Sequence, residues 1–163
     1  MPANADKVLM TISPFIIVTG ALLTFIGIPF TDGLIVSDFN IGILYIIAMS
    51  SVGVIGVILA GWSSNNKWSL YGAMRSAAQI ISYEIPIIMV VVSVGMLSQS
   101  LDLRVIVADQ NPVIYAAILP LGLVIFFISG LAEVGRTPFD IYHAESEVVG
   151  GPFVEYSGAH WSV

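Results

Sequence analysis

The residues of this chain whose types and spacing could support chemistry are carboxylates placed next to apolar segments. Five of the eleven acidic residues fall in one C-terminal stretch: Glu133, Asp140, Glu145, Glu147 and Glu155. This stretch directly follows an apolar run that is long enough to cross a bilayer. Carboxylates in such a place are costly unless they meet water, a partner or a ligand. The stretch is therefore the first candidate for a functional site.

Glu84 interrupts another apolar run. If a helix begins near Ala78, the Glu84 carboxylate lies about 9 Å along its axis. A carboxylate at that depth takes up a proton or finds a partner, and intramembrane acids often relay protons. Pro86 would break the local hydrogen-bond ladder and admit water, which favours a relay. The alternative is an acid near the interface that reaches the headgroups or bonds to Ser82 or Tyr83.

The acidic stretch carries its own counter-ion. Arg136 is the only Lys or Arg in it and follows Glu133 by three residues, so the two could pair if the helix continued. Thr137 precedes Pro138 and is expected to end that helix. The acids alternate with apolar residues such as Phe139. This pattern predicts a partly buried acidic funnel, and the alternative is a solvated acidic loop.

Composition restricts the class of protein. Hydrophobic residues make up 57% of the 163 residues and charged residues only 10%, whereas soluble domains carry about a quarter charged residues. The net charge of −6 argues against nucleic acid. Without cysteine the chain has no thiolate for an iron–sulfur cluster and no thiol nucleophile. His143 and His160 are too differently placed to suggest a metal pair, and no nucleotide-binding loop or nucleophile elbow occurs. We expect neither a metal site nor a catalytic residue.

Four apolar runs must position these groups. They are Val8–Phe30, Ile41–Trp62, Ala78–Ser100 and Val113–Ala132, each close to the roughly 20 residues that a spanning helix needs. The pattern predicts an all-α polytopic membrane protein with a single membrane domain over residues 1–163 and an acidic loop over 133–157. Gly53 and Gly56 lie one turn apart and would let a neighbouring helix approach closely.

Basic residues indicate the orientation. Lys67 and Arg75 lie in a polar, aromatic segment, residues 63–77, which we expect to be a loop. Together with Lys7 and Arg136 they fall on one face, and Arg104 falls on the other. By the positive-inside rule both termini and the acidic loop face the cytoplasm. Anchoring and topology are the simplest roles of Lys67 and Arg75. The alternative is contact with the acidic stretch or with a partner protein.

Two long motifs resemble a known family. They are NNKWSLYGAMRSAAQIISYEIP, from Asn65 to Pro86, and LAEVGRTPFDIYHAESEVVGGPFVEYSG, from Leu131 to Gly158. In order and spacing they resemble the quinone-site membrane subunit of respiratory complex I (NADH:quinone oxidoreductase), called the H subunit or, in mitochondria, subunit 1. The likeness covers essentially the whole chain.

The resemblance implies roles for the acids. It implies that Glu84 and Glu133 belong to a path of intramembrane acids that couples quinone reduction to proton pumping. It places the remaining candidates in or beside the cytoplasmic loop at the foot of the quinone chamber: Arg136, Asp140, Glu145, Glu147 and Glu155. Quinone would be the substrate. FMN and iron–sulfur clusters would belong to partner subunits of the membrane arm and the peripheral arm.

The chain also departs from the family pattern. The family has about eight spans, and its first span, the amphipathic stretch after it and its last spans have no counterpart here, so we expect a partial chain. The expected location is a bacterial plasma membrane, with an organellar inner membrane as the alternative. Three other interpretations stay open: the homologous subunit of a membrane-bound hydrogenase or ferredoxin-linked complex, a stand-alone ion transporter, and a fragment that inserts without assembling.

Overall fold

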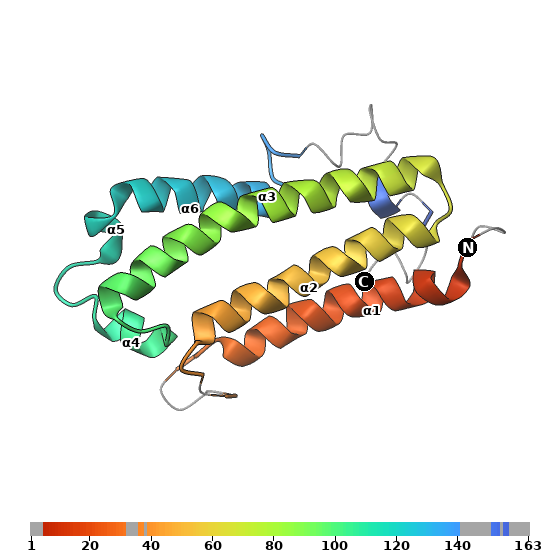
Figure 1. Ribbon diagram of the computed structural model, residues 1–163. Helices are drawn as coiled ribbons and strands as arrows, with labels where there is room; N and C mark the ends of the chain where they lie inside the picture. Colours follow the sequence, from red (N-terminus) through yellow and green to blue (C-terminus); the bar gives the residue numbers. More distant parts are fainter. Residues whose placement is uncertain (1–4, 32–35, 38, 141–150, 154, 157–163) are drawn as a thin grey trace.

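Every regular element in the described residues is a helix. The computed structural model describes residues 5–31, 36–37, 39–140, 151–153 and 155–156. The helices are α1 (Lys7–Thr24), η1 (Phe25–Gly27), α2 (Gly42–Ser63), α3 (Lys67–Ser98), α4 (Leu103–Ala108), α5 (Tyr115–Ile118), α6 (Pro120–Glu133) and η2 (Gly151–Phe153). Helix α1 packs on α2, α2 on α3, and α3 on α6, so the long helices form one row (Figure 1).

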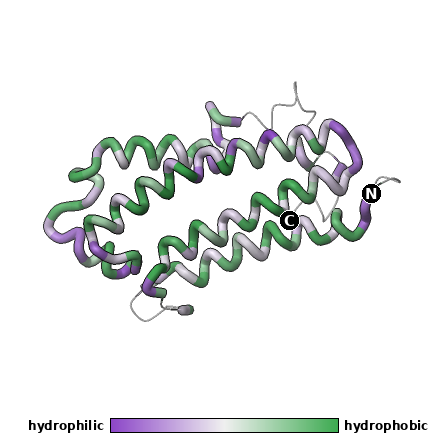
Figure 2. Tube along the Cα trace, viewed as in Figure 1, coloured by the Kyte–Doolittle hydropathy of each residue, from purple (hydrophilic) through white to green (hydrophobic). Residues whose placement is uncertain are grey.

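The exterior of this row is apolar. Leu121, Phe127 and Met96 are 71%, 65% and 76% exposed, and the hydrophobic colouring of Figure 2 runs along the helices while the hydrophilic colouring gathers at their ends. Helices α1 with η1, α2 and α3 are long and apolar enough to cross a bilayer. This confirms the prediction of an all-α polytopic membrane protein.

Helix α3 differs from the predicted third span. It begins at Lys67 rather than at Ala78, because the Asn66 side chain caps it by accepting a hydrogen bond from the Trp68 amide at 3.0 Å. The segment that we expected to be a loop is therefore helical from Lys67 onward. Its 32 residues extend over about 48 Å, more than the roughly 30 Å of a bilayer core. The polar first turns can therefore lie outside the hydrocarbon.

The predicted fourth span is divided. Helix α5 ends at Ile118 and α6 begins at Pro120, with Leu119 between them at φ −118° and ψ 64°. The cause is local, because the residue before a proline avoids the helical conformation. Helix α6 has 14 residues, about 21 Å. It ends beside the middle of α3, which brings its C-terminal acid to that helix (Figure 1).

Close helix packing relies on one of the two glycines named from the sequence. A Cβ built on Gly56 would lie 2.5 Å from Ile17 Cγ1 of α1, whereas a Cβ on Gly53 would meet nothing within 4 Å. Gly56 therefore allows the close α1–α2 approach, whereas a side chain at position 53 would point into open space.

Candidate functional site

Glu84 is half-buried on α3 and is held from a neighbouring helix. The Ser51 hydroxyl of α2 donates a hydrogen bond to Glu84 Oε1. Ser82, a partner considered from the sequence, instead donates to the Ala78 carbonyl of its own helix at 2.6 Å. Sequence reasoning missed Ser51, because only the packing of α2 on α3 brings the two residues together.

A second acid stands near the first. Glu133 is the last residue of α6 and is also half-buried. Its carboxylate interacts electrostatically with that of Glu84 on α3. Two acids that lie far apart in sequence are thus brought within electrostatic range of each other.

A glycine cap ends α6 directly after Glu133. Gly135 has a φ of 64°, its amide donates to the Ala132 carbonyl at 3.2 Å, and the Arg136 amide donates to the Leu131 carbonyl at 3.1 Å. This is a Schellman cap. The helix therefore stops before Thr137, the expected end. Because the chain turns away here, the conditional pairing of Glu133 with Arg136 does not form: no ion pair joins these two described side chains.

The turn after the cap forms a hollow of about 340 Å³. It is lined by Val134, Gly135, Arg136, Thr137 and Asp140. Arg136 and Asp140 are both exposed. A cation and a carboxylate thus line one polar hollow, which directly follows Glu133 in the chain.

The far end of the acidic stretch is also anchored. Glu155 is half-buried and accepts a hydrogen bond from Asn66 Nδ2 at 2.6 Å. The Ser69 hydroxyl donates to the Pro152 carbonyl at 2.7 Å. Ser13 Oγ and the Tyr156 hydroxyl, both buried, share a hydrogen bond of 2.7 Å. Residues of α1 and of the start of α3 therefore hold Pro152, Glu155 and Tyr156. Glu145, Glu147 and His143 lie outside the described residues.

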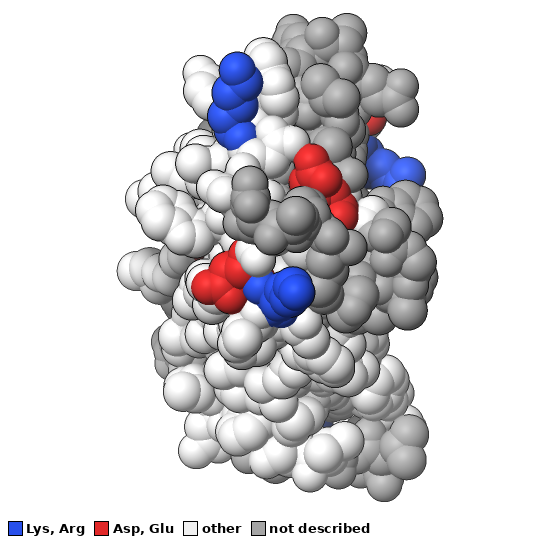
Figure 3. All heavy atoms as spheres, turned by 90° about the vertical axis from the view of Figure 1, so that its right-hand side faces the viewer, with Lys and Arg blue, Asp and Glu red and all other residues white. Residues whose placement is uncertain are grey.

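The two cations predicted for partner contact lie on the first turns of α3. Lys67 is exposed, and its Nζ lies 5.3 Å from the ring centroid of Trp68. Arg75 is half-buried and interacts within the chain. Figure 3 looks onto the end of the row where α1 and α3 begin, and it shows basic and acidic side chains on this face.

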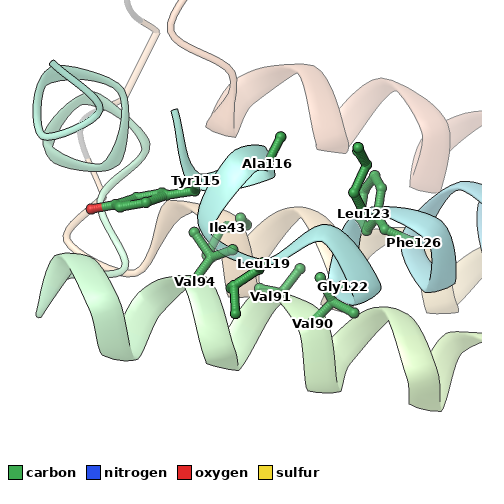
Figure 4. A pocket seen from close by; sticks show the side chains of 10 residues that line it. All are labelled: Ile43, Val90, Val91, Val94, Tyr115, Ala116, Leu119, Gly122, Leu123 and Phe126. Atoms are coloured by element: carbon green, nitrogen blue, oxygen red, sulfur yellow. The ribbon is translucent and has the colours of Figure 1, made fainter. Parts of the chain in front are cut away.

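A separate apolar cavity lies at the other end of α6. Its volume is about 230 Å³, and its wall includes Val90, Val94, Leu119, Gly122 and Tyr115 (Figure 4). None of its lining residues is an acid or a base apart from the Tyr115 phenol. The cavity lies where the chain breaks between α5 and α6, and its lining shares no residue with the acidic site.

Comparison with known proteins agrees with the motifs. The family model described as NADH dehydrogenase matches residues 1–163. The H subunit of NADH-quinone oxidoreductase from Bacillus cereus is 48% identical over 162 residues, which cover 99% of this chain and 49% of that protein. The protein of the same name from Bacillus thuringiensis matches with the same identity and coverage. The chain thus spans about half the length of these curated relatives.

Proposed function

The chain belongs to the NADH dehydrogenase family, and from that premise we propose that it serves as a membrane-arm subunit of a proton-translocating NADH:quinone oxidoreductase. In this role it forms part of the wall of the quinone chamber and part of the acidic path that couples quinone reduction to proton pumping. The names of its relatives support quinone as the substrate of the complex. The apolar helices support its place in the bilayer.

The observation that carries this proposal is the Glu84–Glu133 pair. The two carboxylates come from α3 and α6 and interact electrostatically, and Glu133 directly precedes in the chain the residues that line the hollow with Arg136 and Asp140. Reduction of a quinone to a quinol takes up two protons and two electrons. The change of charge shifts the pKa of nearby acids. Each unit of pKa shift corresponds to about 1.4 kcal/mol. Coupled acids titrate as a group, so the charge change can pass from one to the next.

Redox chemistry belongs to partner subunits in this proposal. The chain has no cysteine to hold an iron–sulfur cluster, so FMN and the clusters are assigned to other subunits. Arg136, Asp140, Glu145, Glu147 and Glu155 are assigned to the loop at the foot of the chamber. Lys67 and Arg75, on the first turns of α3, are assigned to contact with a partner. The bacterial relatives support a plasma membrane location, and cytoplasmic termini remain a prediction.

The test uses the assembled complex in its membrane. We expect Glu133→Gln and Arg136→Ala to lower NADH:quinone reductase activity several-fold while NADH oxidation by a hydrophilic artificial acceptor is unchanged. Met96→Leu, a change at an exposed apolar position, serves as the control. Unchanged quinone turnover in both site variants would reject the proposal. Lack of inhibition by quinone analogues, with hydrogenase genes adjacent, would favour a hydrogenase-related subunit instead.

A further inference from the structure

Gln79 of α3 binds two main-chain carbonyls that lie near the two ends of the loop 134–140, which carries Arg136 and Asp140. Its Nε2 atom is 2.8 Å from the Ala132 carbonyl and 2.8 Å from the Phe139 carbonyl. A primary amide has two N–H donors, so each carbonyl receives one. Ala132 belongs to the last turn of α6, and Phe139 follows the cap, so one side chain joins the start of the loop to its end.

Phe139 is held by α3 at a second point. Its ring meets the ring of Tyr83 edge-on, with centroids 5.5 Å apart and planes at 63°. Tyr83 follows Gln79 by four residues and therefore lies on the same face of α3. The Phe139 amide also donates to the Arg136 carbonyl at 2.8 Å. Phe139 is thus fixed through its carbonyl, its ring and its amide.

We propose that Gln79 is a positioning residue: it closes the loop 134–140 onto α3 and so sets where Arg136 and Asp140 stand relative to Glu133. Arg136 and Asp140 are exposed, whereas Ala132 is fully buried and Phe139 is half-buried. The loop is therefore held through its two ends, and its charged side chains are left facing the hollow. The consequence for quinone chemistry rests on the proposed function, but the closure of the loop does not.

Gln79 bonds to main-chain carbonyls, so its contacts do not depend on which side chains the residues Ala132 and Phe139 carry. An apolar residue at position 79 would remove the side-chain donor from both carbonyls: the Phe139 carbonyl would lose the Gln79 hydrogen bond, and the Ala132 carbonyl would keep its bond from the Gly135 amide. A glutamate would set carboxylate oxygens against two carbonyl oxygens. Gln79→Leu and Gln79→Glu should therefore release the loop, and the second should do so with almost no change of shape.

The first experiment is hydrogen–deuterium exchange with mass spectrometry on the purified complex. The amides of Gly135 and Arg136 donate to carbonyls of the last turn of α6, and the Phe139 amide donates to the Arg136 carbonyl. Local opening sets their exchange rates. In Gln79→Leu we expect exchange of peptides covering 134–140 to rise about fivefold or more, the factor for one lost hydrogen bond. Ser82→Ala is the matched control, because it removes a hydrogen bond internal to α3. Unchanged exchange in Gln79→Leu would overturn the proposal.

The second experiment separates positioning from general damage. We expect Gln79→Leu to raise the apparent KM for quinone about fivefold with a smaller change in kcat, and to leave artificial-acceptor activity unchanged, while Ser82→Ala changes neither constant. Faster exchange with unaltered quinone kinetics would overturn the positioning role. Should Gln79→Leu not assemble, Tyr83→Leu tests the same loop through the ring contact. The proposed function fails separately, through Glu133→Gln and Arg136→Ala, whatever the exchange result.

Discussion

The hydroxyl of Ser51 on α2 donates a hydrogen bond to the carboxylate of Glu84 on α3. Ser51 Oγ also lies 3.0 Å from the Ile47 carbonyl of its own helix, so its position is fixed from both sides. The position of the Glu84 carboxylate therefore depends on a residue of another helix.

Removing this hydroxyl should disturb proton transfer more than electron transfer. In Ser51→Ala we expect fewer protons translocated per NADH oxidised, because Glu84 loses the hydroxyl that holds its carboxylate against α2. Quinone reductase activity should stay within about twofold of normal, the effect of a fraction of a hydrogen bond. Proton uptake by sealed vesicles measures the ratio. Ser50→Ala is the control, since within the described part of the chain the Ser50 hydroxyl donates to the Ile47 carbonyl of its own helix. Equal ratios in the two variants would contradict the prediction.

Replacing the acid itself should have a larger effect. Glu84→Gln keeps the shape and can still accept from Ser51, but it cannot release a proton. We expect proton translocation coupled to quinone reduction to be weakened or lost, while NADH oxidation by an artificial acceptor continues. Vesicle acidification with a pH-sensitive dye measures this. A fully coupled Glu84→Gln enzyme would return Glu84 to the role of an acid near the interface.

The two glycines of α2 give a matched pair for packing. Gly56→Ala forces a methyl group to within 2.5 Å of Ile17 Cγ1, and overpacking of this kind costs about 1–3 kcal/mol. Gly53→Ala meets open space and gains helix propensity, up to about 1 kcal/mol. Thermal denaturation of the detergent-solubilised complex should therefore show a lower transition for Gly56→Ala only. Equal transitions would show that α1 and α2 do not pack as described.

The buried hydrogen bond between Ser13 and Tyr156 should anchor Tyr156 to α1. Ser13→Ala leaves the Tyr156 hydroxyl without its 2.7 Å partner, at a cost of about 1–3 kcal/mol. Tyr156→Phe should cost a similar amount, and the double variant should cost less than the sum of the two. Thermal unfolding of the four proteins completes the cycle. Strict additivity would mean that the two hydroxyls do not interact.

Some of the site could be predicted from sequence because it depends on the hydropathy of neighbouring residues in the chain. Glu84 interrupts an apolar run, and Glu133 ends another, so their burial follows from hydropathy alone. The family follows from two motifs. The early start of α3 is not predicted, because residues 67–77 are polar and aromatic and resemble a surface loop, although the Asn66 cap is a readable signal.

Other features depend on tertiary contacts that no local pattern encodes. Ser51 is one of several serines on α2, and only the rotation of α2 against α3 selects it. Gln79 lies in a helix whose sequence gives no hint of two backbone acceptors from another segment. The Gly135 cap is within reach of sequence reasoning, since glycine after an apolar run often ends a helix. Thr137 and Pro138 form the more obvious stop signal, and they point to a later end.

Helix α3 carries Asn66 and Ser69 near one end and Glu84 further along, and no proline interrupts it between Lys67 and Ile85. A helix without a proline kink is stiff. We therefore expect movement of the first turn of α3 to be transmitted along the helix to Glu84. We expect a displacement of Pro152 or Glu155, which bond to Ser69 and Asn66, to move the Glu84 carboxylate as well. We therefore expect the position of the first turn of α3 and proton transfer at Glu84 to be linked through this single helix.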